Sequence, residues 1–161
     1  MIKIDKNITI KLIFIMSVVA LTSAFFIEYV LEHQPCNLCV LERIPYLLAI
    51  IIIVLNYKSV HFEKNFILVL TLIFLIATTL SLYHLGIEQG FITESSVCDL
   101  QSGFSYLSKD EILKQLQQKN VNCKDVTFKV FGLSLTAFNI VISCLITIIL
   151  IRMYFQDGNN K

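Results

Sequence analysis

Two cysteines separated by two residues, Cys36 and Cys39, have the clearest chemical potential in the sequence. The C-x-x-C spacing lets two sulfur atoms approach within bonding distance, and the local field can lower the pKa of one thiol so that it attacks or leaves readily. The motif follows one long apolar run and precedes another, which would hold it at a membrane surface. Two further cysteines, Cys98 and Cys123, lie in the only long polar segment. The arrangement suggests an electron relay between a soluble dithiol and an acceptor dissolved in lipid.

The same four cysteines allow two other interpretations. A C-x-x-C pair also ligates zinc, but Cys98 and Cys123 are far apart in the sequence, whereas the second pair of a zinc ribbon is again closely spaced. Purely structural disulfides are the other alternative. A bond between Cys98 and Cys123 would contribute about 3 kcal/mol in the chain-entropy model, whereas a ring between Cys36 and Cys39 constrains little of the unfolded chain. A short disulfide ring beside a cation is more typical of a redox-active pair than of a structural one. Cys144, within an apolar run, is expected to be an inert small hydrophobe.

Arg43 is the cation beside this ring. It follows Cys39 by four residues at the predicted start of a helix, so the two side chains share a face. A charge one turn into the membrane needs a counter-charge or a polar ligand. Arg43 would stabilise a Cys39 thiolate and can donate a hydrogen bond to a quinone carbonyl. Alternatively it pairs with Glu42 or Glu28, or snorkels outward. For Glu28 the simpler interpretation is that it reaches the interface beside Tyr29.

The composition indicates that lipid is the solvent of most of the chain. Hydrophobic residues make up 56% and charged residues 16% of the sequence, and its mean hydropathy is +0.74. Soluble globular domains carry about 25% charged residues. The net charge of +1 gives no basic excess that would favour a nucleic-acid partner. Five cysteines, four of them outside the apolar runs, fit an oxidising compartment.

Four apolar runs predict transmembrane helices at about 8–31, 40–56, 66–85 and 130–154. The first is unlike a cleaved signal peptide because its apolar stretch continues to Leu31, beyond the small-residue site that ends at Ala24. Short connections between the spans predict an all-α membrane protein, an antiparallel four-helix bundle that forms a single transmembrane domain over residues 1–161. Pro35 restrains the entry to the C-x-x-C motif and suits a helix that begins near Cys36.

The basic residues predict the orientation of the bundle. Lys3, Lys6 and Lys11 precede the uncharged part of the first span, which begins at Leu12, and the loop up to Cys39 contains no lysine or arginine. Both termini are therefore expected in the cytoplasm and the loops at about 32–39 and 86–129 on the other side. In the longer loop, Ser108 and Glu111 fit a capping box that begins a short amphipathic helix. That helix is expected either on the membrane surface or against a protein neighbour.

Several segments together resemble a known family. They are residues 35–43 (PCNLCVLER), residues 83–90 (YHLGIEQG), the later pair Cys98 and Cys123, and residues 131–139 (FGLSLTAFN). In this order they resemble the disulfide bond formation protein B (DsbB) family, four-span oxidoreductases of the bacterial inner (cytoplasmic) membrane. Members reoxidise a periplasmic thioredoxin-like dithiol oxidase (DsbA-type) with a membrane quinone. The P-C-x-L-C-x-x-E-R block is specific, and the matching segments extend over nearly the whole chain.

The resemblance implies catalytic roles for the four cysteines. Cys36–Cys39 would be the quinone-facing disulfide, with Cys39 as the thiolate that interacts with the quinone ring. Cys98–Cys123 would be the periplasmic shuttle pair, in which Cys98 is the sulfur attacked by the partner. Cys123 would then exchange with Cys36 through an interloop disulfide and pass two electrons inward.

The resemblance also implies two quinone-binding residues, Arg43 and His84, the latter at a position where the family has a histidine near the quinone. Glu88 stands where some members carry glutamine, and its role stays open. The expected function is a quinone-dependent thiol oxidase, with ubiquinone or menaquinone as cofactor and no metal, that sustains protein disulfide bond formation. A redox-inert subunit with a zinc-binding or structural cysteine cluster is the main alternative. A reductase that sends electrons outward would need a thiol on the cytoplasmic side, for which Cys144 is the only candidate.

Overall fold

The computed structural model describes residues 5–56, 64–93, 98, 123–124, 129–130 and 132–158. Its helices are α1 (Lys6–Tyr29), α2 (Asn37–Leu41), α3 (Arg43–Asn56), α4 (Lys64–Glu88) and α6 (Leu135–Gly158). Four segments are long and apolar enough to cross a membrane, and α2 and α3 together make one of them. The prediction of an all-α, multi-pass membrane protein is confirmed. The predicted amphipathic helix near residues 108–116 lies outside the described residues.

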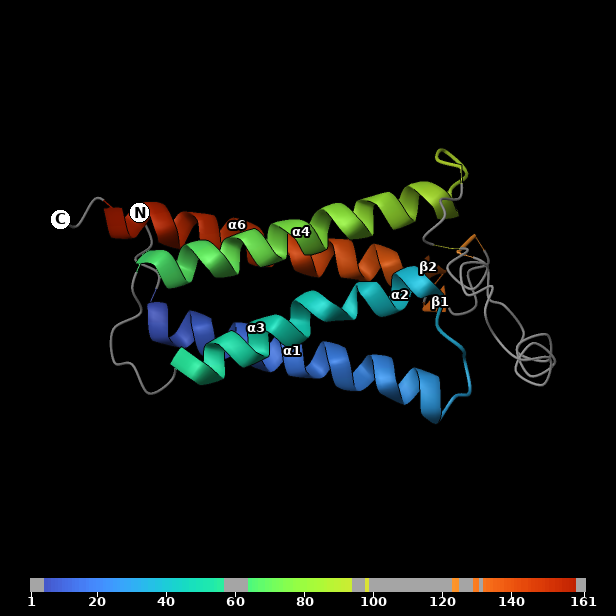
Figure 1. The fold of residues 1–161 in the computed structure, drawn as a ribbon, viewed down its shortest axis with the longest axis horizontal. Coiled ribbons are helices and arrows are strands. Elements are labelled where there is room, and N and C mark those ends of the chain that lie inside the picture. The colour runs from blue at the N-terminus through green and yellow to red at the C-terminus, as the bar shows by residue number, and fades with distance from the viewer. Residues whose placement is uncertain are drawn as a thin grey trace, which may run out of the picture.

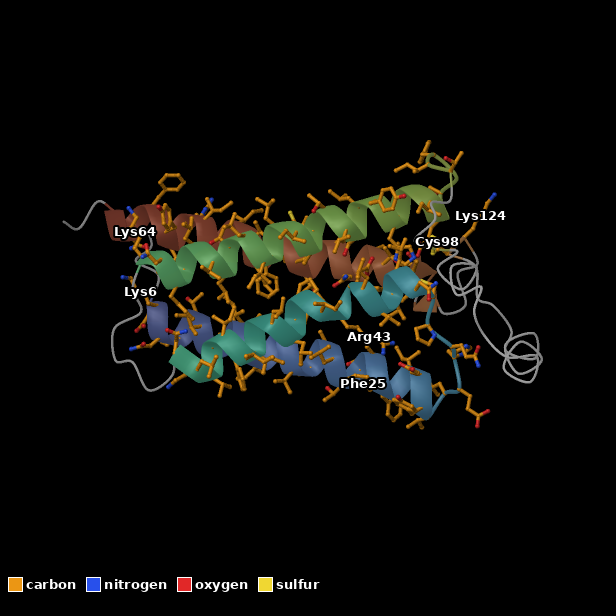
Figure 2. The ribbon with its side chains drawn as sticks, viewed as in Figure 1. Lys6, Phe25, Arg43, Lys64, Cys98 and Lys124 are labelled. Carbon is orange, nitrogen blue, oxygen red and sulfur yellow. A yellow bond between two sulfur atoms is a disulfide. The ribbon has the colours of Figure 1, made fainter. Side chains whose placement is uncertain are left out.

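The helices pack as two pairs, α1 against α3 and α4 against α6. Figure 1 shows both chain termini at one end of the bundle, and α2 with the two short strands at the opposite end. Cys98 and Lys124 lie at that second end, whereas Lys6 and Lys64 lie at the end of the termini (Figure 2). All the described redox cysteines are therefore gathered at one end of the bundle.

Apolar side chains from all four spans form the core of the bundle. Its fully buried members include Ile67, Leu70 and Phe74 from α4 and Leu150 from α6. Ala49 and Ala77 are also buried, and small side chains of this kind let helix backbones approach closely. The outward faces are apolar too: Ile8 is 66% exposed and Leu55 is 71% exposed. Such surfaces suit helices that have lipid rather than water around them.

The fourth span begins later than the sequence predicted. Residues near Val130 were expected to be helical, but β1 (Lys129–Val130) pairs antiparallel with β2 (Leu133–Ser134). Gly132 has a φ of 82°, a left-handed conformation that glycine adopts at little steric cost in a tight hairpin turn. The hydroxyl of Ser134 accepts a hydrogen bond from the Ala137 N–H, as an N-cap residue does. Turn and cap together set the start of α6 at Leu135.

Candidate redox site at the cysteine end of the bundle

The C-x-x-C segment forms the start of α2, as the position of Pro35 predicted. Cys36 is the N-cap residue, and its sulfur accepts a hydrogen bond from the Cys39 N–H at 3.1 Å. The two cysteines are joined in a disulfide. Cys36 is only 5% exposed, whereas Cys39 is partly buried. The two sulfurs of one bond therefore have different surroundings.

Cys98 and Cys123 form a second disulfide. Both pack in one apolar cluster with Cys36, Leu38 and Ile87. The side-chain amide of Asn37 donates a hydrogen bond to the Cys98 carbonyl at 3.2 Å. These four cysteines thus form two disulfides that pack in one cluster, while Cys144 is a free thiol. Adjacent pairs are the arrangement that thiol–disulfide exchange between them requires.

His84 of α4 lies against the first disulfide. Its side chain is buried, and its Nε2 is 3.5 Å from the Cys36 sulfur. Its other ring nitrogen, Nδ1, is 2.8 Å from the Oε1 atom of Glu42, which is itself 8% exposed. A single imidazole therefore connects a redox sulfur to a buried carboxylate.

A hydrogen-bond network among α3, α4 and α6 fixes Glu42 in place. The Asn139 amide donates to Glu42 Oε2 at 2.8 Å and to the Ser81 hydroxyl at 2.7 Å. The Tyr46 hydroxyl donates to the Asn139 side-chain oxygen. Among the described residues, every buried side-chain nitrogen and oxygen has a partner. A satisfied network of this kind gives the buried carboxylate one defined position.

Glu88, whose role the sequence left open, lies on another side of the His84 ring. Its Oε1 accepts a hydrogen bond from the Thr136 hydroxyl and is 3.8 Å from His84 Nε2. The Thr136 oxygen is also 3.3 Å from His84 Nδ1. His84 is therefore placed between two carboxylates, one in α4 and one at the junction of α2 and α3.

A cavity of about 290 Å³ lies beside the Cys36–Cys39 disulfide. Its polar lining includes Cys39, Glu42, Arg43, Tyr46 and Asn139. Most of the remaining lining is apolar and comes from α1 and α6: Met16, Val19, Ala20, Leu21, Ala24, Ile27, Leu135, Phe138 and Ile142. Cys36 and His84 are not among the lining residues. Two partners of His84, Glu42 and Thr136, do line the cavity, and the predicted role of His84 near a quinone stays a prediction.

Arg43 lines the cavity together with Cys39, as their shared helix face predicted. Its guanidinium forms an ion pair with Glu28 of α1, and its Cζ lies 5.2 Å from the centre of the Phe25 ring. Arg43 and Phe25 are labelled near one another in Figure 2, in the half of the bundle nearer Cys98. The structure thus contains the Arg43–Glu28 pair that the sequence allowed as an alternative, and both partners are partly exposed, at 17% and 23%.

Sequence reasoning missed several residues of the network: Tyr46, Ser81, Thr136 and Asn139. It also considered Glu42 only as a partner of Arg43. A polar or ionisable residue inside a membrane span is a signal of function in its own right. That signal was present at Glu42, Ser81 and Asn139, but which of them meet depends on how the helices pack.

Comparisons with known proteins agree with this geometry. The sequence model of a family described as Disulfide bond formation protein DsbB matches residues 6–153. The chain is also 29% identical over 163 residues to an uncharacterized protein of Rickettsia prowazekii (strain Madrid E), and the match covers 99% of this chain and 95% of that protein. No solved structure matches the chain significantly.

Proposed function

The chain belongs to the DsbB family of disulfide bond formation proteins, whose members are thiol oxidoreductases, and from this we propose a specific reaction for it. The protein oxidises a periplasmic thioredoxin-like dithiol oxidase of the DsbA type and transfers the two electrons to a membrane quinone. The observation that carries the proposal is the position of the Cys36–Cys39 disulfide. It lies between a second disulfide, Cys98–Cys123, and a largely apolar cavity.

Electrons enter through the Cys98–Cys123 pair. Cys98 is partly buried and Cys123 is 2% exposed, so the partner's thiolate attacks the Cys98 sulfur and the Cys123 thiolate leaves. Cys123 then attacks Cys36, and the Cys39 thiolate leaves. The partner's second thiol displaces Cys98 and completes the partner's disulfide. The Cys98 thiolate attacks Cys123, re-forms Cys98–Cys123 and releases Cys36. One dithiol has been oxidised and Cys36–Cys39 has been reduced.

The residues around the cavity fit a quinone, either ubiquinone or menaquinone. When bound there, a quinone supplies an acceptor for two electrons and two protons. Arg43 offers N–H donors at the polar end for a carbonyl oxygen, and a guanidinium has five such donors. The apolar residues of α1 and α6 suit the ring face and the isoprenoid tail. A volume of about 290 Å³ is close to the lower end of the range for ligand pockets, about 300–1,000 Å³.

The two thiols that re-form the disulfide must also release two protons. Cys39 lines the cavity and releases its proton there, but Cys36 does not. The nearest base to the Cys36 sulfur is His84 Nε2, which accepts the proton as Nδ1 returns one to Glu42. Glu42 lines the cavity and holds that proton at its wall. His84 and Glu42 therefore serve as an acid–base pair for the sulfur that lacks direct access to the cavity.

The distribution of basic residues supports an orientation with both termini in the cytoplasm. Lys6 and Lys64 lie at the end of the bundle where both termini are (Figure 2). Cytoplasmic ends of membrane helices carry an excess of lysine and arginine. The cysteine end then faces the periplasm of a bacterial inner membrane, where disulfides persist and a DsbA-type partner is found.

Quinone reduction by the purified protein tests the proposal. Reduced thioredoxin-like oxidase is supplied anaerobically with ubiquinone or menaquinone, and quinol formation is followed by absorbance. The wild type and a Cys144→Ser control are expected to turn over, whereas Cys39→Ser and Cys98→Ser are inactive. Turnover that survives the loss of Cys98 would assign the second pair to structure alone. Absence of turnover by the wild type with either quinone would refute the proposed reaction.

A further inference from the structure

The Cys36–Cys39 disulfide and His84 form a group with the donor atoms of a metal site. The two sulfurs and a ring nitrogen of His84 all lie within 4.8 Å of one another. Among the described residues this is the one group of three or more cysteine, histidine or acidic side chains that is so placed. Thiolate sulfur and imidazole nitrogen are the ligands that zinc and similar soft divalent cations prefer.

The distances suit tetrahedral coordination. With Zn–S bonds of about 2.3 Å and Zn–N bonds of about 2.0–2.1 Å, a tetrahedral zinc ion separates a sulfur from a nitrogen ligand by about 3.6 Å. The Cys36 sulfur and His84 Nε2 are already 3.5 Å apart. Only the two sulfurs must separate, and they are bonded to each other in this structure. Reduction of the disulfide removes that constraint.

The surroundings of His84 are those of a metal-ligating histidine. Its Nδ1 is 2.8 Å from Glu42 Oε1, and a carboxylate that accepts a hydrogen bond from one ring nitrogen directs the lone pair of the other toward a metal. That other nitrogen, Nε2, is the one beside Cys36. Glu88 Oε1 is 3.8 Å from Nε2 but is not part of the three-ligand group, so the fourth position is left to water. Two thiolates offset the charge of a divalent cation in this buried region.

We propose that the dithiol form of this protein binds one zinc ion, or a similar soft divalent cation, through Cys36, Cys39 and His84, and that the disulfide form does not. Binding converts two thiols into two zinc-bound thiolates and releases two protons, with no change in oxidation state. While the metal is bound, neither sulfur is available to re-form the disulfide, so the cation arrests the enzyme in its reduced state. The arrest depends on the proposed function, whereas the binding does not.

Metal titration of the full-length protein tests the binding. The protein is reduced anaerobically with a phosphine, desalted and titrated with zinc in competition with a chromophoric chelator. A Cys98→Ser/Cys123→Ser background removes the other pair of thiols. One zinc per reduced chain is expected, and none per oxidised chain. Glu42→Gln should weaken binding about 10–100-fold, as loss of an outer-shell partner does, while Cys144→Ser leaves it unchanged.

Spectroscopy identifies the ligands without any substitution at the proposed site itself. X-ray absorption of zinc bound to the reduced background protein should show two sulfur ligands and at least one imidazole nitrogen. Cobalt in place of zinc should give the intense visible bands of a tetrahedral site. Equal binding by the disulfide form, a site without sulfur, or undiminished affinity in Cys36→Ser would each overturn the proposal.

Turnover measurements separate this inference from the proposed function. Zinc added to the reduced protein should block quinone reduction, and a chelator should restore it. Unimpeded turnover at saturating zinc would refute the arrest. A protein that binds zinc in its reduced form but reduces no quinone even without metal would refute the proposed function and leave the metal site standing.

Discussion

At the scale of single residues, the two sulfurs of one disulfide have separate tasks. Cys39 faces the cavity, and Cys36 faces His84 and the second cysteine pair. Glu42 connects the two sides because it contacts the imidazole and also lines the cavity. The proposed proton transfer therefore depends on Glu42, which reaches Cys36 only through His84.

Glu42→Gln tests this dependence, since glutamine keeps the shape of the side chain but cannot carry the proton. We expect quinone reduction by the prereduced protein to slow by about 10²-fold or more, the usual contribution of acid–base catalysis. The rate at which the partner reduces Cys36–Cys39 should change little, because the thiolate exchanges of that half-reaction do not pass a proton through His84 and Glu42. Single-turnover kinetics measures the two half-reactions separately. Thr79→Val, which removes an exposed hydroxyl that bonds only within α4, is the control. Equal slowing of both half-reactions would contradict the role of Glu42.

The ion pair between Arg43 and Glu28 makes a second prediction at this scale. Both side chains retain some exposure, 17% and 23%, so breaking the pair should cost less than in a fully buried site. Glu28→Gln is expected to lower the free energy of unfolding by about 1–2 kcal/mol. Thermal unfolding followed by circular dichroism in detergent measures this. Glu32→Gln, at an exposed position, should have no effect. An unchanged melting temperature in Glu28→Gln would show that the pair adds no stability.

At the scale of the elements, small side chains set the distance between helices. Ala49 in α3 and Ala77 in α4 are 0% and 1% exposed. The polar network that holds Glu42 joins the same two helices to α6. Side chains at the buried positions must be small, whereas lipid-facing positions of the same helices accept larger side chains because lipid chains adapt to them.

Ala77→Leu should therefore destabilise the bundle by about 1–3 kcal/mol, since added methylenes force neighbouring side chains and backbone to move. The matched control is Ile76→Leu, at the adjacent position that is 54% exposed. Thermal unfolding of both variants in the same detergent gives the comparison. Similar melting temperatures for the two would mean that the helices are not closely packed at Ala77.

At the scale of the whole molecule, one end of the bundle carries the cysteine pairs and the other carries both termini. The proposed reaction with a periplasmic partner requires that the cysteine end face the periplasm.

Labelling in intact spheroplasts tests the orientation. In a Cys123→Ser variant, Cys98 should react with a membrane-impermeant maleimide without permeabilisation. In a cysteine-free background, Lys64→Cys at the opposite end should react only after permeabilisation, because Lys64 is exposed but on the cytoplasmic side. The reverse pattern would invert the proposed topology.

How far the sequence alone could predict this structure depends on whether a feature is local. Hydropathy is local, so all four spans were predicted, and Pro35 predicted the start of α2. The contacts of Asn139 with Glu42 and Tyr46 join residues 97 and 93 positions apart, and no pattern within one helix encodes such contacts. The hairpin before α6 was missed because its short strands read as a continuation of an apolar run. The amphipathic helix near residues 108–116 and the roles of Arg43 and His84 in quinone binding remain predictions.

The lining of the cavity bears on which measure of quinone concentration would set the reaction rate. Met16 and Val19 of α1 line the cavity and are 37% and 52% exposed, so the described chain leaves both side chains partly uncovered. A cavity that opens on this side would meet the hydrocarbon around the bundle. A quinone would enter by lateral diffusion within the bilayer and need never cross water. The fraction of enzyme that has quinone bound would then depend on the mole fraction of quinone in the lipid. The concentration of quinone per volume of buffer would not matter. Diluting a proteoliposome suspension would leave the reaction rate per enzyme unchanged, whereas diluting the quinone with additional lipid would lower it.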